Sequence, residues 1–82
     1  MTMKTSKRFA EIAGWYGVVA ILAAYALLSF GFIRVTDASY QILNATGALG
    51  IIIDAYHAKN WQPVVLNTFW LVIAIISLMK AT

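Results

Sequence analysis

The feature that most constrains this chain is its stretch from Ile12 to Ile33, which carries no charged side chain. As a helix this stretch would be roughly 33 Å long, enough to cross the apolar core of a bilayer. Two further apolar stretches follow, at residues 39–58 and 63–79. Only 11% of the residues are charged, too few to cover the surface of a water-soluble domain of this size. The sequence therefore predicts an all-α integral membrane protein with three transmembrane helices.

The connections between the apolar stretches are short, so consecutive helices are expected to be antiparallel neighbours. Residues 12–82 would then form one up-down-up bundle, preceded by a basic cytoplasmic tail at residues 1–11. The first apolar stretch is longer than that of a secretory signal, and no small-residue cleavage site follows it. We therefore expect it to be a retained helix.

The positively charged residues predict the orientation, because cytoplasmic loops carry an excess of lysine and arginine. One side of the bundle would hold Lys4, Lys7, Arg8 and Lys59, and the other Arg34 and Lys80. The N-terminus is accordingly expected in the cytoplasm and the C-terminus outside it.

Small residues recur along the expected helices and predict where these pack. Apolar burial cannot drive helices together in lipid, so close backbone approach and hydrogen bonds must do so. The first helix has a seam of small residues at alternating three- and four-residue steps, which ends at Gly31. The residues predicted to pack at helix interfaces are Ala13, Gly17, Ala20, Ala24, Gly47 and Gly50.

Four polar or aromatic residues within the expected spans are the candidates for a substrate site or pathway: Asn44, Asp54, Asn67 and Trp70. Polar groups avoid lipid and are expected to face other helices. A rise of about 1.5 Å per residue gives each a depth in the membrane. Equal depths predict three contacts between helices: Asp54 with Asn67, Trp70 with Gly50, and Asn44 with Tyr25.

Each candidate also has a structural interpretation. Asp54 would be either an interfacial residue or a proton or cation site, and the two asparagines either interhelical hydrogen-bonding groups or solute ligands. Trp70 would be either core packing or a platform for a ligand. One histidine near one aspartate is too little to predict a metal site. No catalytic set, phosphate-binding loop or basic stripe is present, so we expect no enzyme activity, no cofactor and no nucleic-acid partner.

Two short motifs, SYQILNATGA from Ser39 and VVLNTFW ending at Trp70, carry a resemblance. Together with the small-residue first span, they resemble a family of small, uncharacterised bacterial membrane proteins that are loosely called permeases. The layout is also similar to that of the SemiSWEET transporters of the PQ-loop group, which are dimers of three-helix units. Asn67 matches an asparagine of their third span. The resemblance implies an oligomeric protein of the bacterial inner membrane.

Two functions are consistent with these observations. The first is a SemiSWEET-like homo-oligomeric transporter of a small solute, because three helices cannot enclose a pathway alone. The second is an accessory or assembly subunit docked on a larger membrane complex. A transporter requires polar residues near the midplane. The asparagines on either side of the central glycines favour the transporter.

Overall fold

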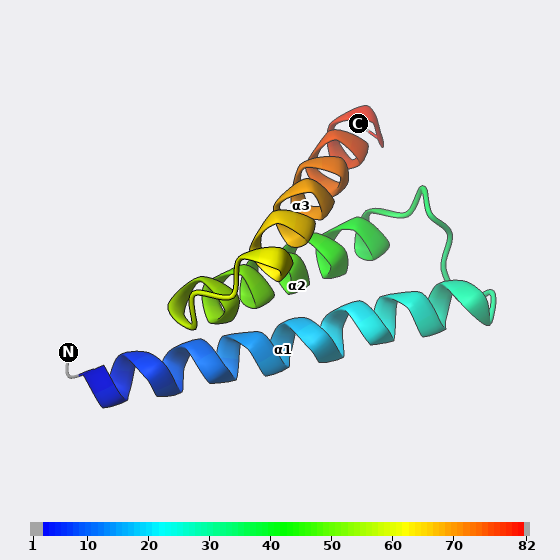
Figure 1. Ribbon diagram of the computed structural model, residues 1–82. Coiled ribbons are helices and arrows are strands. Elements are labelled where there is room, and N and C mark those ends of the chain that lie inside the picture. Colours follow the sequence, from blue (N-terminus) through cyan, green and yellow to red (C-terminus); the bar gives the residue numbers. More distant parts are fainter. Residues whose placement is uncertain (1–2, 82) are drawn as a thin grey trace.

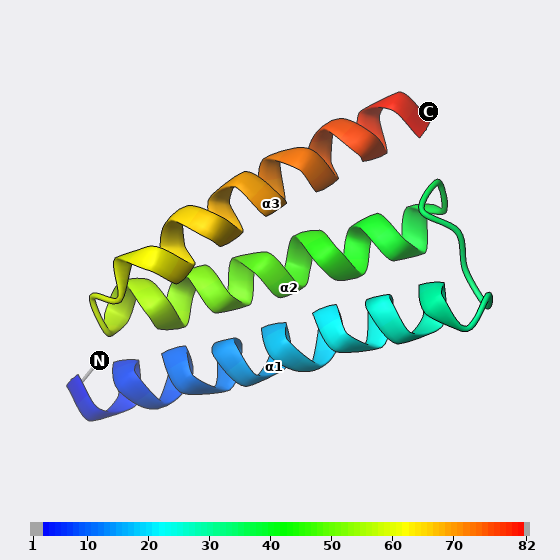
Figure 2. The ribbon, with the colours of Figure 1, turned by 45° about the vertical axis from the view of Figure 1, so that its right-hand side comes forward.

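The computed structural model describes residues 3–81 and contains three helices in that range. They are α1 (Met3–Ser29), α2 (Ala38–His57) and α3 (Trp61–Ala81). The predicted all-helical fold with three helices is confirmed. Consecutive helices run in opposite directions, and α2 lies between the other two (Figures 1 and 2).

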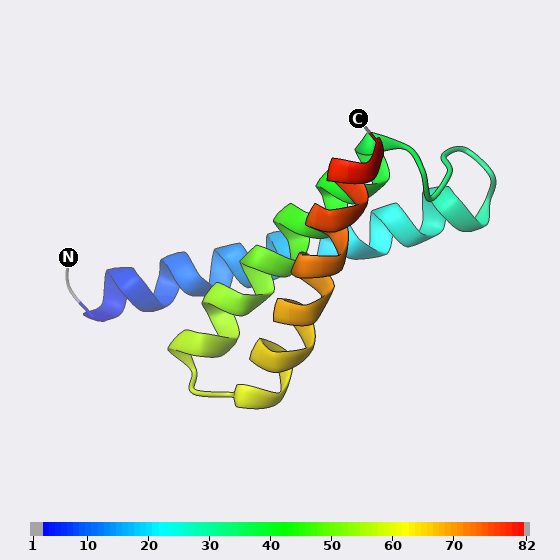
Figure 3. The ribbon, with the colours of Figure 1, turned by 90° about the horizontal axis from the view of Figure 1, so that it is seen from above.

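The three helices form an open arrangement in which α2 separates α1 from α3. Both α1 and α3 pack on α2, but no contact joins α1 to α3 among the described residues. Seen from above, α1 and α3 cross α2 in different directions (Figure 3). The reason is that α2 carries small residues on one side and polar residues on another, so its two neighbours occupy separate faces.

The first helix begins at Met3 rather than at Ile12, so most of the predicted tail is helical; Met1 and Thr2 lie outside the described residues. Lysine, arginine, alanine and glutamate favour helix formation, and this composition explains the earlier start. The helix ends at Ser29 because Gly31 adopts a φ of 83°, which only glycine adopts readily. The amides of Gly31 and Phe32 donate to Leu28 and Leu27, the pattern of a Schellman motif. Gly31 is therefore a helix stop and not part of the packing seam.

Two side chains fix the connection from α1 to α2. Asp37 is at the N-cap position of α2, but its carboxylate accepts the Arg34 amide at 2.9 Å and caps no helical amide. Gln41 is buried in the first turns of α2 and donates to the Val35 carbonyl at 2.8 Å. These bonds hold the loop against the start of α2.

The turn from α2 to α3 has the same hydrogen-bond pattern but no glycine. Lys59 has a φ of 58°, and its amide donates to Tyr56 while that of Asn60 donates to Ala55. In this left-handed conformation a lysine is roughly 1–2 kcal/mol less favourable than a glycine. The turn is therefore tight and strained at one residue.

The interior of the structure consists mainly of small residues, together with the amide side chains of Gln41, Asn44 and Asn67. Among the residues whose burial is described, the buried apolar ones are all alanines: Ala10, Ala20, Ala24, Ala48, Ala55 and Ala74. Large apolar side chains lie outside, with Trp15 71% and Phe69 67% exposed. Among the described residues, two helices are long and apolar enough to cross a membrane, over Ser6–Ser29 and Trp61–Lys80. The helix α2 is not a third candidate span, because its polar residues lower its mean hydropathy.

Candidate functional site

A pocket of about 220 Å³ lies between α2 and α3 and is the best candidate for a binding site. Its walls combine polar and aromatic residues of α2 with one face of α3. The lining residues are Val35, Tyr40, Gln41, Asn44, Trp70, Ile73, Ala74 and Ser77. Two of the four candidates from the sequence, Asn44 and Trp70, therefore meet here.

Asn44 and Trp70 form the polar link between α2 and α3. The indole Nε1 of Trp70 donates to Oδ1 of Asn44 at 3.2 Å. Asn44 is only 4% exposed, and its Nδ2 donates to the Tyr40 carbonyl one turn earlier at 2.9 Å. The second bond orients the amide so that its oxygen points to the tryptophan. The predicted pair of Asn44 with Tyr25 is therefore wrong, and Tyr25 is 66% exposed.

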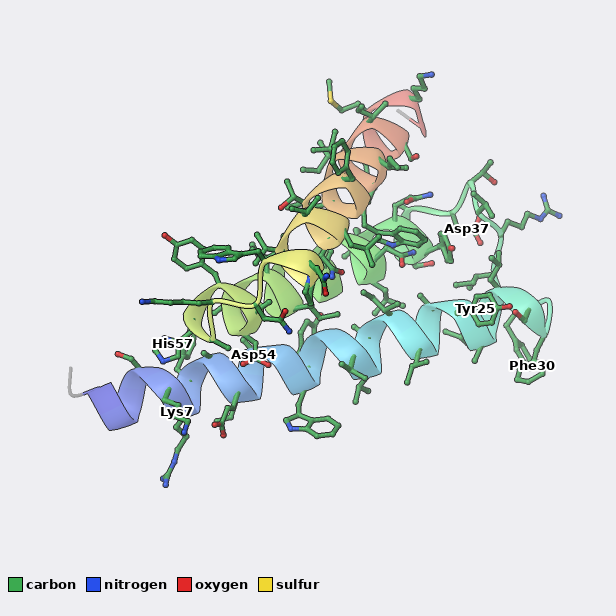
Figure 4. The ribbon with its side chains drawn as sticks, in the orientation of Figure 1. Lys7, Tyr25, Phe30, Asp37, Asp54 and His57 are labelled. Carbon is green, nitrogen blue, oxygen red and sulfur yellow. The ribbon has the colours of Figure 1, made fainter. Side chains whose placement is uncertain are left out.

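Asp54 and Asn67 do not pair. A Cβ atom added at Gly14 of α1 would lie 2.7 Å from the Asp54 Cβ, so Asp54 packs on α1 (Figure 4). Asn67 lies on α3, where its Nδ2 donates to the Pro63 carbonyl at 2.9 Å. The two residues have matching depths but lie on different sides of α2. Depth gives position along the helix axis, whereas the face that a residue occupies depends on how the helices rotate against each other.

Trp70 also does not pack on Gly50. A Cβ atom at Gly50 would collide with the Ala13 carbonyl oxygen, so this glycine contacts the α1 backbone. Trp70 is 45% exposed and borders the pocket. Gly50 lies on the α1 side of α2 and Asn44 on the α3 side, which explains why the tryptophan meets the asparagine.

The six residues predicted to pack all lie along the contact of α1 with α2. A Cβ atom at Gly47 would lie 3.0 Å from the Gly17 carbonyl oxygen and 3.2 Å from the Ala20 Cβ. Gly17 in turn faces the Gly47 carbonyl, and Ala13 faces Gly50. Ala24 is fully buried. The backbones of the two helices therefore approach closely over several turns.

The sequence interpretation missed three residues that position these interfaces. Gln41 lines the pocket and fixes the preceding loop, and its place one turn before Asn44 is the signal that could have revealed it. Gly14 provides the space for Asp54. Tyr16 hydrogen-bonds Thr46 at 2.7 Å across α1 and α2, which no spacing in the sequence indicates because both side chains are exposed.

The arrangement of polar groups is suited to binding and helix association. Among the described residues, every buried side-chain nitrogen or oxygen has a hydrogen-bond partner. The described residues also contain no group of three or more His, Cys, Asp or Glu side chains that could hold a metal ion. His57 lies at the opposite end of the molecule from Asp37 (Figure 4). The α2–α3 pocket thus offers amide, hydroxyl and indole groups for recognition.

A family model matches residues 10–82, and the matched family is uncharacterised. The chain belongs to this family. The match covers all of α2 and α3 and most of α1, including both pocket walls and the glycine contact. Nothing in it links the chain to the SemiSWEET transporters. No curated protein and no solved structure matches the chain.

Proposed function

We propose that this protein is an integral membrane protein that carries a small solute as an assembly of identical copies. The observation that carries the membrane location is the distribution of side chains, with an alanine and glycine interior and large apolar residues outside. Only 22% of the apolar span in α1 and 11% of that in α3 is buried. The core helix of a soluble protein would bury most of such a span, whereas lipid solvates it.

The α2–α3 pocket supports carriage of a solute. Polar side chains inside a membrane are costly and commonly mark substrate pathways. Here Asn44, Gln41, Ser77 and Trp70 border one cavity. A few convergent polar groups in an otherwise apolar concave site are typical of small-molecule binding sites.

The open arrangement of the helices supports an assembly of copies. Because α1 and α3 do not contact each other, one copy does not enclose a pathway. A second copy placed against the pocket would complete its wall. The carrier is therefore proposed to function as a homo-oligomer in the bacterial inner membrane.

Cross-linking tests this assembly directly, because the chain contains no cysteine. Ser77→Cys places a single thiol at the pocket, and the matched control Val72→Cys places one on a different face of α3. We expect disulfide-linked dimers from Ser77→Cys in membranes and few from Val72→Cys. If the two variants cross-link to the same extent, or if neither cross-links, the proposed assembly through the pocket is contradicted.

The orientation in the membrane has its own test. The basic N-terminal residues and Lys59 support a cytoplasmic N-terminus under the positive-inside rule. A periplasmic reporter fused after Thr82 should be active, and a cytoplasmic reporter at the same position inactive. The reverse result would overturn the proposed orientation.

An accessory subunit is the second candidate, and one observation favours it. Asn44 and Trp70 bond each other, so the polar residues of the pocket already hold α2 to α3 without a solute. Purification in mild detergent distinguishes the two functions. A carrier should purify as a discrete homo-oligomer, whereas an accessory subunit should be stable only in stoichiometric association with a larger membrane complex.

A further inference from the structure

The α2–α3 pocket continues at one end into a second cavity of about 370 Å³. The two cavities share Val35, Gln41 and Ser77 in their walls. The second cavity adds Thr36 and Lys80, which lie where the α1–α2 loop approaches the last turn of α3. The two cavities therefore form one groove along α3, which we call the α2–α3 groove.

The end of this groove at Lys80 has the chemistry of an anion site. Lys80 provides a positive charge, and the hydroxyl groups of Thr36 and Ser77 line the same cavity. No acidic side chain is among the described residues that line either part of the groove. Lysine is a frequent phosphate ligand because its ammonium group is a compact charge with three donors.

The opposite end has an apolar wall on α3, across from the polar residues Gln41 and Asn44 of α2. Ile73, Ala74 and the ring of Trp70 form its α3 wall. At 1.5 Å per residue, Trp70 is about 15 Å along the helix from Lys80, the scale of part of an acyl chain. Lys80 is also the last residue of the apolar span in α3, the depth at which lipid headgroups lie.

We propose that the α2–α3 groove binds one anionic phospholipid of the bilayer. The phosphate lies beside Lys80, Ser77 and Thr36, and one acyl chain runs along Ile73 to Trp70. This inference rests on the proposed function, since it requires a membrane and names the class of ligand that the pocket takes. Charge complementarity at one end and an apolar wall at the other favour an amphiphile over a fully polar solute.

Quenching of Trp70 fluorescence by brominated lipids tests the proposal. The variant Trp15→Phe/Trp61→Phe keeps Trp70 as its only tryptophan. It is reconstituted in phosphatidylcholine vesicles that contain a small fraction of either phosphatidylglycerol or phosphatidylcholine with brominated acyl chains. We expect half-maximal quenching at about fivefold lower mole fraction of the anionic lipid, the effect of about 1 kcal/mol from one lysine at a charged surface. Equal quenching by both lipids would overturn the proposal.

Matched lysine variants locate the headgroup. Lys80→Gln, with Thr36→Val as an independent second variant, should reduce the preference for the anionic lipid. Lys59→Gln removes a lysine from the turn at the other end of α3 and should retain it. Helix content by circular dichroism shows that each variant is folded. A preference that survives Lys80→Gln, or is lost equally with Lys59→Gln, contradicts the assigned site.

Two further arms separate the sources of failure. An excess of inorganic phosphate should leave the lipid preference unchanged. If phosphate abolishes the preference, the site binds a free anion instead of a lipid. The variant Trp15→Phe/Trp70→Phe reports on Trp61, which is 54% exposed on α3. Quenching of Trp61 by both brominated lipids, without any preference at Trp70, would refute only the lipid site. No quenching of Trp61 would refute the membrane location itself.

Discussion

The two interfaces of α2 are built in different ways. Towards α1, glycine and alanine bring backbone against backbone, so that added atoms at Gly47 or Gly50 would meet main-chain oxygens. Towards α3, the contact depends on side chains, with Trp70 donating to Asn44. In the views of Figures 1 and 2, α3 diverges from α2 towards its C-terminal end, while α1 stays alongside over most of its length.

This difference explains where the structure has room for a ligand. A glycine interface excludes everything between two backbones, and the cavity beside Gly14 and Asp54 opens at its edge. An interface held by an asparagine and a half-exposed tryptophan leaves space around the rings and amides, which becomes the α2–α3 groove. The α1–α2 contact therefore leaves no room between its backbones, whereas the contact of α2 with α3 leaves the α2–α3 groove.

The largest effect is expected from filling the glycine interface. Gly50→Leu places a side chain against the Ala13 carbonyl, which cannot move without shifting α1. Overpacking of this kind costs about 1–3 kcal/mol. Thermal unfolding in detergent should show the loss, while Ala38→Leu, at an exposed position of the same helix, should have little effect. Equal stability of the two variants would mean that α1 and α2 do not approach as closely as described.

The side-chain interface should respond to loss of its hydrogen bond. Trp70→Phe removes the donor to Asn44 and leaves a nearly buried amide oxygen with one bond fewer, at a cost of about 1–2 kcal/mol. Trp15→Phe is the matched control, because that ring is 71% exposed. If both substitutions change the unfolding temperature alike, the bond across α2 and α3 contributes nothing to stability.

The two turns offer a reciprocal test of their left-handed residues. Gly31→Lys should destabilise the end of α1 by about 1 kcal/mol, through backbone strain alone, since no atom lies within 4 Å of the added Cβ position. Lys59→Gly should stabilise the other turn by a smaller amount, because glycine loses more entropy on folding. Denaturant titration of both variants measures the difference. Changes of the same sign would contradict the assigned conformations.

The smallest effect is expected at the exposed hydrogen bond of the glycine interface. Tyr16→Phe removes the hydroxyl that bonds Thr46, and bonds of this kind between membrane helices average about 0.6 kcal/mol. A double-mutant cycle with Thr46→Ala isolates the pair. A coupling energy as large as the Trp70 effect would show that side chains, and not glycines, hold α1 to α2.

Spacing and composition were sufficient for much of the fold. Apolar stretches predicted three antiparallel helices, and small residues at three- and four-residue steps marked the side of α1 that meets α2. Asn67, which was expected to face other helices because it is polar, is buried on α3. These predictions work because a helix has a fixed rise and period, so sequence distance converts directly into length and face.

The contacts between specific residues depended on the tertiary structure. Asp54 and Asn67, and Trp70 and Gly50, have matching depths but lie on different faces of the central helix. Sequence spacing fixes each position within its own helix, but not the rotation of one helix against another. That rotation is decided by which close approaches are possible, here Gly17 with Gly47 and Gly50 with Ala13. Only when these are made does Asn44 turn towards α3, where it meets Trp70 and forms one wall of the pocket.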